Sequence, residues 1–143
     1  MTLGRRDKCM ELKATGLQMN LVPHSKADEE DWAKVALTIG CNGFRGEFVA
    51  WLQTRDIQRF RNELVTMYQS IGTPAKARLC SAEPDIDIEL SSDWRGHIVG
   101  NYRFESERVN GTPTVLSGGF EMDQSFIPDL TKQLEGLVLS LNA

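Results

Sequence analysis

The chain has 143 residues, of which 41% are hydrophobic and 25% are charged, and its formal net charge at pH 7 is −4. A chain of this length fits a single domain, residues 1–143, that buries a core without disulfide or metal support. No signal peptide or membrane-spanning run is found, so we expect a cytoplasmic protein.

The charged residues are unevenly distributed. Residues 1–80 contain 12 Lys or Arg and 9 Asp or Glu (+3), whereas residues 81–129 contain 3 and 10 (−7). Phosphate binding needs clustered basic residues, so the acidic second half argues against a nucleic-acid partner. The acidic second half would suit a basic protein partner. A simpler explanation fits equally well, in which the acidic residues only keep a small protein soluble.

The first half of the chain predicts four strands. Short strands are expected over residues 9–14 and 17–22, and an acidic loop follows over residues 28–31. Residues 32–39 and 44–52 alternate between apolar and polar side chains on either side of Asn42-Gly43, which is a strong hairpin signal. Residues 1–31 are thus expected to contain the two short strands and the acidic loop.

A helix is predicted after these strands, because the apolar positions change to spacings of three and four. They are Ile57, Phe60, Leu64, Met67, Tyr68 and Ile71. Thr54 is the expected N-cap, and Gly72 with Pro74 ends the helix.

The second half predicts four further strands and a closing helix. The strands are expected over residues 75–82, 85–90, 97–105 and 114–122, with a bulge or a close backbone approach at Gly118-Gly119. The last helix begins at Asp123 or Ser125 and buries Phe126, Leu130, Leu134, Leu137 and Leu141. We therefore predict an α+β fold of two layers, in which two helices pack on one face of an antiparallel sheet of about six to seven strands.

No sequence pattern indicates a catalytic, cofactor or metal site. His24 and His97 have no partner at metal-ligand spacing, and Cys9, Cys41 and Cys80 are isolated, which favours reduced thiols. The glycines of residues 40–46 lie between two strands rather than before a helix, so they fit neither phosphate-binding pattern.

The strand over residues 85–90 carries the first candidate contact surface. Its alternation places Asp85, Asp87 and Glu89 on one face, opposite Ile86, Ile88 and Leu90. A solvated face is the simplest interpretation, a partner-binding patch is the second, and a catalytic or metal-binding row is the third. Arg103 or His97 on the next strand could pair with these carboxylates.

The turn after this strand carries the second candidate. In Asp93-Trp94-Arg95, Trp94 has no apolar neighbours in sequence. An exposed Trp beside Asp93 and the acidic strand would make a good interface anchor, since such anchors are enriched in Trp and Arg. A Trp that folds back onto the sheet is the competing interpretation.

Several segments together resemble a known family. They are the strand begun by Trp32, Phe44-Arg45-Gly46-Glu47-Phe48, the Phe60…Leu64 stripe, Ala77-Arg78-Leu79 with Glu83, Asp93-Trp94-Arg95-Gly96-His97-Ile98, and Phe120-Glu121-Met122-Asp123-Gln124 before a Leu-rich helix. Over about residues 32–141 the chain resembles the WapI-like immunity proteins, which protect bacteria from toxins. The turn departs from the family pattern at Trp94 and Arg95.

The resemblance implies a small cytoplasmic protein that binds and blocks a toxin domain, often a nuclease, without catalysis. The expected interface consists of Asp85, Asp87, Glu89, Asp93, Trp94 and Arg95. Two alternatives stay open. A small-molecule-binding domain or enzyme would use a pocket near His97, Tyr102 or Arg103, and an oligomer subunit would expose Val49 and Trp51 as an apolar patch. The sequence does not define the oligomeric state.

Overall fold

The structure is a computed structural model that describes residues 9–81 and 85–142. Its elements are β1 (Met10–Ala14), β2 (Leu17–Pro23), β3 (Trp32–Cys41), β4 (Phe44–Gln53), α2 (Thr54–Gln69), β5 (Ala75–Cys80), β6 (Ile86–Ser92), β7 (Ile98–Val109), β8 (Thr112–Met122), the 3-10 turn η1 (Gln124–Phe126) and α3 (Ile127–Asn142). The predicted order of strands and helices is confirmed. Ala82, the expected end of a strand, and Glu83 lie outside the described residues.

The strands form two antiparallel sheets of four. Sheet A has the order β1-β2-β3-β4, and sheet B has the order β5-β6-β7-β8. The predicted α+β class with antiparallel pairing and two helices is therefore confirmed, but the single sheet of about six to seven strands is wrong. The helix α2 separates β4 from β5 along the chain, and the bridge between Thr15 and Glu121 connects β8 to the turn after β1.

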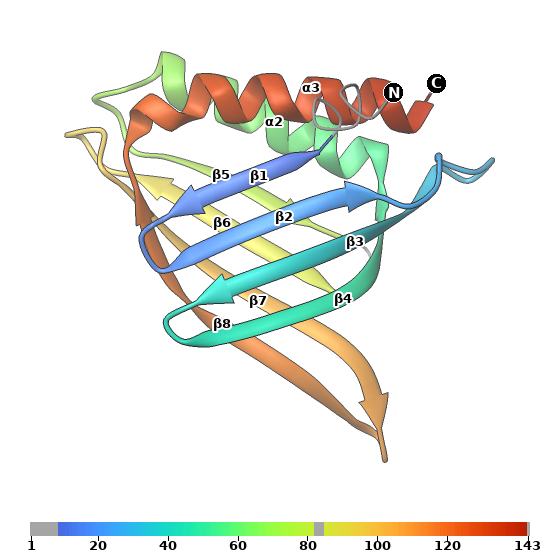
Figure 1. Cartoon of the computed structure of the whole chain (residues 1–143). Coiled ribbons are helices and arrows are strands. Elements are labelled where there is room, and N and C mark those ends of the chain that lie inside the picture. Colours follow the sequence, from blue (N-terminus) through green and yellow to red (C-terminus); the bar gives the residue numbers. More distant parts are fainter. Residues whose placement is uncertain (1–8, 82–84, 143) are drawn as a thin grey trace.

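The two sheets face each other, and both helices lie side by side along one edge of the pair (Figure 1). On that edge α2 packs against β5, and α3 packs against β1 and β2. Away from the helices the sheets touch directly, because the Phe48 ring of β4 lies 6.0 Å from the Phe104 ring of β7. The core thus fills the space between the sheets and beneath the helices.

The inward faces of the strands follow the predicted alternation. Ile86, Ile88 and Leu90 are buried, as are Ala50 and Leu52 on β4. Phe44, expected on the same inner face, is 68% exposed because it lies in the first strand position after the hairpin turn.

Both helices bury most of their predicted stripes. Ile57, Phe60, Leu64 and Met67 of α2 are buried, and so are Leu130, Leu134, Leu137 and Leu141 of α3. The prediction of a core position is wrong for three residues, because Tyr68, Ile71 and Phe126 are more than two-fifths exposed. Ile71 follows the end of α2, and Phe126 lies in the 3-10 turn before α3, where Ile127 takes the buried position instead.

The predicted N-cap of α2 is one residue too late. The cap is Gln53. Its side chain accepts a hydrogen bond from the backbone N–H of Asp56, the third residue of the helix, and the Asp56 carboxylate accepts one from the Gln53 N–H at 3.2 Å. This reciprocal arrangement is a capping box, in which Gln takes the place usually held by Ser or Thr.

No bulge is found at Gly118-Gly119, but the alternative, a close backbone approach, is confirmed, because a Cβ atom on Gly16 would lie 2.8 Å from the Gly119 carbonyl oxygen. The register of β7 and β8 shifts instead between Glu105 and Arg108. Gly118 leaves room for an aromatic ring, because a Cβ atom there would lie 2.5 Å from the Tyr102 hydroxyl oxygen.

Candidate functional site

Two carboxylates of β6, Asp87 and Glu89, lie on the outer face of sheet B, and Asp85 directly precedes the strand. Asp85, Asp87 and Glu89 are each partly exposed, whereas the intervening residues are buried, so the predicted division of faces is confirmed. In the register of the sheet, Asp87 lies between Cys80 of β5 and Arg103 of β7, and Glu89 lies between Arg78 and Asn101.

Asp87 is engaged in an ion pair within the protein. Its two carboxylate oxygens accept hydrogen bonds from Nε and Nη2 of Arg78 at 2.9 and 2.7 Å. This two-point pair raises the pKa of the Arg78 guanidinium. Asp87 therefore contributes less net negative charge to this face than the sequence suggests.

The expected cross-strand partners of the acidic row are wrong. Arg103 pairs instead with Glu105 of its own strand, and His97 Nε2 lies 3.5 Å from Glu121 Oε1. Arg78 was missed because residues 81–85 separate β5 from β6, which is longer than a two-residue hairpin loop with a fixed register. Without a known turn the register that brings β5 beside β6 cannot be read from sequence.

Asp93 holds the turn between β6 and β7. Its Oδ1 atom accepts hydrogen bonds from the backbone N–H groups of Arg95 at 2.9 Å and His97 at 3.0 Å. Its own carbonyl accepts a hydrogen bond from Gly96 N–H at 3.0 Å. Asp93 thus shapes the turn, as Asp commonly does in loops of this type.

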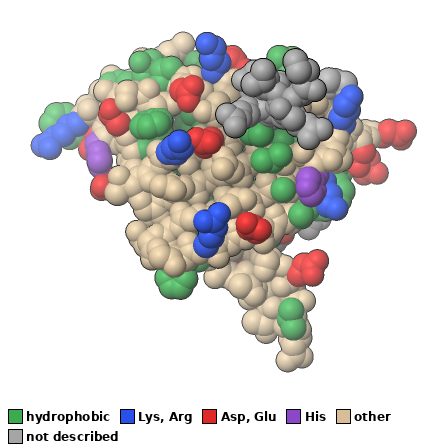
Figure 2. Space-filling view, viewed as in Figure 1, with side chains coloured by type: hydrophobic (Ala, Val, Ile, Leu, Met, Phe, Trp, Pro, Cys, Tyr) green, Lys and Arg blue, Asp and Glu red, His purple; other side chains and the backbone are tan. Residues whose placement is uncertain are grey.

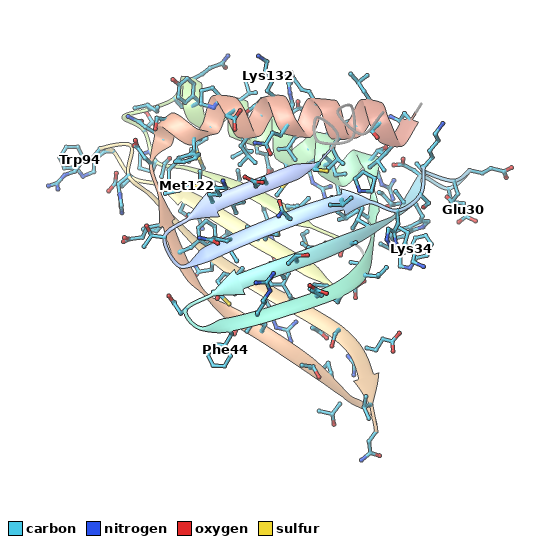
Figure 3. The ribbon with its side chains drawn as sticks, viewed as in Figure 1. Glu30, Lys34, Phe44, Trp94, Met122 and Lys132 are labelled. Atoms are coloured by element: carbon cyan, nitrogen blue, oxygen red, sulfur yellow. The ribbon has the colours of Figure 1, made fainter. Side chains whose placement is uncertain are left out.

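The turn displays Trp94 and Arg95 to solvent. Trp94 is 65% exposed, so the interpretation in which it folds back onto the sheet is wrong. Figure 3 shows its side chain at the far end of the molecule, pointing away from both sheets. The Arg95 guanidinium carbon lies 4.7 Å from the centroid of the Trp94 ring, a cation–π contact that holds the two together.

The turn is fixed to the rest of the molecule at Gly96. A Cβ atom at this position would lie 2.5 Å from Gln124 Oε1 and 3.3 Å from a methyl group of Ile71. Ile71, which follows α2, and Gln124, which begins η1, therefore pack against the turn. Ile71, which is 41% exposed, adds apolar surface beside it.

A second exposed apolar region lies on the outer face of sheet A. Val22, Ala36 and Val49 are aligned across β2, β3 and β4, and Trp51 lies two residues along from Val49. Val22, Val49 and Trp51 are each slightly more than two-fifths exposed. On the side of the molecule shown in Figure 2, charged groups of both signs are scattered among polar ones.

The residues expected to line a small-molecule pocket do not come together. Tyr102 points into the core and stacks against Phe104 and Phe120, whereas Arg103, the next residue, points outward. Within residues 9–81 and 85–142, no three His, Cys, Asp or Glu side chains are grouped so that they could hold a metal ion. In the same ranges no helix is long and apolar enough to cross a membrane.

The fold and its exposed turn define an α+β protein that presents an exposed Trp on a turn held by backbone hydrogen bonds to Asp93. Over residues 1–141 the sequence matches the immunity protein WapI-like family, and the chain belongs to that family. The predicted resemblance is confirmed, and it extends over residues 1–31, which had no assignment. Family membership implies a toxin protein as the partner.

No curated protein matches the sequence. A chain from the crystal structures of Trypanosoma bruciei MRP1/MRP2 matches with a TM-score of 0.47 and 10% identity, over 92% of this chain and 84% of that one. At this level the likeness supports no conclusion about fold or function.

Proposed function

We propose that this protein neutralises a toxin by binding it directly, without catalysis, in the bacterial cytoplasm. The contact surface consists of the turn with Asp93, Trp94 and Arg95 and of the outer carboxylates Asp85, Asp87 and Glu89. The observation that carries the proposal is the exposure of Trp94 with Arg95 against its ring. Trp and Arg are enriched among the residues that dominate binding energy, and a rigid turn lowers the entropic cost of using them.

The charge distribution supports a basic toxin domain, such as a nuclease. Residues 81–129 carry 3 Lys or Arg against 10 Asp or Glu. A surface of this sign steers a basic partner toward the complex and raises the association rate. Glu89 is the member of the row that we expect to contribute most, because Asp87 is paired with Arg78.

The turn is tested with the purified toxin domain encoded beside this gene. Replacing Trp94 with Ala should weaken binding by about 30-fold or more, since anchor residues contribute at least about 2 kcal/mol. Trp51→Ala is the matched control, because Trp51 is also partly exposed but lies on sheet A. If Trp51→Ala weakens binding and Trp94→Ala does not, the interface lies on sheet A and the proposal is wrong.

The acidic row is tested by association kinetics. Glu89→Gln should slow association at low salt and leave dissociation nearly unchanged, because a charge at the rim acts mainly on encounter. A nuclease assay with equimolar protein then shows whether binding also suppresses nucleic-acid cleavage. A complex that forms while cleavage continues at full rate would contradict neutralisation by binding.

A further inference from the structure

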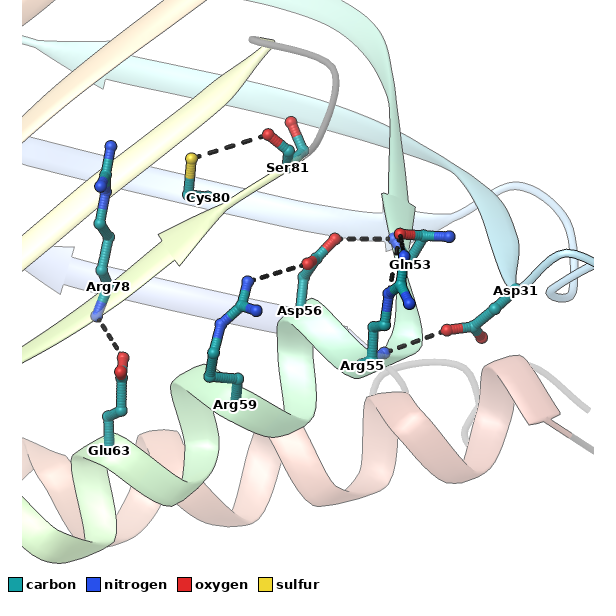
Figure 4. Close-up of polar contacts among 9 residues, drawn as sticks. All are labelled: Asp31, Gln53, Arg55, Asp56, Arg59, Glu63, Arg78, Cys80 and Ser81. Carbon is teal, nitrogen blue, oxygen red and sulfur yellow. Dashed lines mark hydrogen bonds and ion pairs between the residues drawn. The ribbon is translucent and has the colours of Figure 1, made fainter.

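A polar groove runs between α2 and the edge strand β5, and its lining residues are different from those of the proposed toxin interface. The α2 side of the groove is a stripe of residues spaced three and four apart: Arg55, Gln58, Arg59, Asn62, Glu63 and Thr66. Cavities of about 430 and 540 Å³ share Arg55, Arg59 and Glu63, so they are two stretches of one groove, the α2–β5 groove (Figure 4).

The α2–β5 groove is positively charged although the chain as a whole is acidic. Its lining contains four basic side chains, Arg55, Arg59, Lys76 and Arg78, against two acidic ones, Asp56 and Glu63. Four minus two leaves a net charge of +2, or +1 when Asp87, the ion-pair partner of Arg78, is included, whereas the whole chain carries −4. A local reversal of sign is favourable for an anionic ligand.

Two of these basic groups have no carboxylate partner within the described residues. The Arg55 guanidinium donates both of its hydrogen bonds to the neutral amide oxygen of Gln53, at 3.0 and 2.8 Å. Lys76 is exposed, and its ammonium group forms no ion pair with any residue of ranges 9–81 and 85–142. Arg59 and Arg78, in contrast, pair with Asp56 and Asp87.

The β5 edge already receives one carboxylate from the protein itself. Glu63 Oε1 accepts a hydrogen bond from the Arg78 backbone N–H at 2.9 Å. Backbone N–H groups on an antiparallel strand alternate between its two sides, and β6 occupies the other side of β5. The N–H groups of Lys76 and Cys80 therefore point into the groove together with that of Arg78.

We propose that the α2–β5 groove binds an extended acidic segment of a protein partner. The segment lies along the edge of β5, where backbone hydrogen bonds add to the sheet, and its carboxylates contact Arg55 and Lys76. Glu63 shows how a carboxylate fits against this edge. The proposal does not depend on the toxin interface at Trp94.

A peptide suits the groove better than a nucleic acid does. The carboxylates of Asp56 and Glu63 lie among the basic groups, where a continuous phosphate backbone would meet them. Among the described residues that line the two cavities none is aromatic, so these residues offer bases no ring on which to stack. A peptide can place acidic residues opposite the basic groups and neutral residues opposite Glu63.

The test measures fluorescence anisotropy of a labelled octapeptide that alternates Asp and Val, with the full-length protein. Binding should weaken as NaCl rises from ~50 to ~300 mM, because the contacts are exposed. Arg55→Gln with Lys76→Gln should weaken binding by about tenfold. The matched control, Lys26→Gln with Arg45→Gln, also removes one Lys and one Arg charge, at exposed positions outside the groove, and should change affinity by less than about twofold.

A further variant should act in the opposite direction. Glu63→Gln keeps an oxygen to accept the Arg78 N–H but removes a negative charge, so it should tighten binding of the peptide by about two- to fivefold. This variant keeps the test decisive if the double variant unfolds. Absence of peptide binding, equal loss in the control variant, or equally tight binding of a single-stranded oligo-dT of the same charge would each overturn the proposal.

Discussion

Two glycines of sheet B give aromatic rings the space that they occupy in the core. The Tyr102 ring lies 5.5 Å from Phe104 and 6.4 Å from Phe120, measured between centroids. Phe120 lies against Gly100, and Tyr102 lies against Gly118, at a distance that leaves no room for a methyl group. The sequence shows these glycines, but only the register of β7 and β8 reveals which ring each one accommodates.

Replacing Gly100 with Ala should therefore destabilise the fold. Its Cβ atom would overlap the Phe120 ring, and overpacking of this kind costs about 1–3 kcal/mol. The control is Gly40→Ala on β3, where a Cβ atom meets no other atom within 4 Å. Urea unfolding measures both variants, and equal stability of the two would contradict this account of the core.

The hydroxyl of Tyr102 should make stability depend on alkaline pH. Burial, followed by its hydrogen bond to Cys41, raises the pKa of Tyr102 from 10.0 to about 12. The unfolded chain thus loses this proton first. The stabilisation is complete below about pH 10 and decreases as the pH rises toward 12.

This dependence is measured as the melting temperature between about pH 9 and pH 11.5, for the natural chain and for Tyr102→Phe. Phe lacks the ionisable hydroxyl, so the decrease should be shallower in the variant, by up to about 2 kcal/mol in unfolding free energy. Parallel curves would show that Tyr102 ionises equally easily in both states.

At the scale of elements, α2 depends on its capping box. Asp56 is 5% exposed, accepts the Gln53 N–H, and pairs with Arg59 at 3.0 Å. Its negative charge in the first turn also interacts favourably with the helix dipole. The capping box also fixes the direction in which α2 leaves β4, because Gln53 is both the last residue of the strand and the cap of the helix.

Asp56→Ala should lower the free energy of unfolding by about 1–2 kcal/mol. Gln58→Ala is the control, since Gln58 is exposed on the same helix and Ala is a good helix former. Thermal melts followed by circular dichroism compare them. If Asp56→Ala has the same melting temperature as the natural chain, the capping box contributes nothing to stability.

Most elements could be predicted from the sequence, because their periodicity is local. The alternation of β6 and the apolar stripes of α2 and α3 placed most of their residues, though not Tyr68, on the correct faces. The exposure of Trp94 and the Arg78–Asp87 pair could not be predicted in this way, since both depend on segments that meet only in the folded chain. For the same reason Arg103 and His97 were given the wrong partners.

At the scale of the whole molecule, the described residues form two units of four strands followed by a helix, and each helix packs on the other unit's sheet. The helix α2 follows sheet A but contacts β5, and α3 follows sheet B but contacts β1 and β2. Hydrogen bonds join the same partners: Gln133 Oε1 accepts the Glu11 N–H at 2.6 Å, and Leu141 O accepts the Ala27 N–H at 2.9 Å. A single sheet was predicted because sequence patterns do not show this exchange.

Neither unit should fold alone. Fragments 1–72 and 73–143 should each lack a cooperative thermal transition, since each leaves a sheet without the helix that covers it. Mixed in equal amounts, they should assemble into a complex with the circular dichroism spectrum of the intact chain. A fragment that melts cooperatively by itself would show that its own helix is sufficient.

The exchange of helices also sets an order of events during synthesis. The segment that covers the first strands, α3, follows both sheets along the chain, so it leaves the ribosome after them. Sheet A must therefore remain with an uncovered apolar edge until α3 has emerged, a period in which chaperones have access to it. Sheet A thus reaches its final, covered form only after α3 has been synthesised.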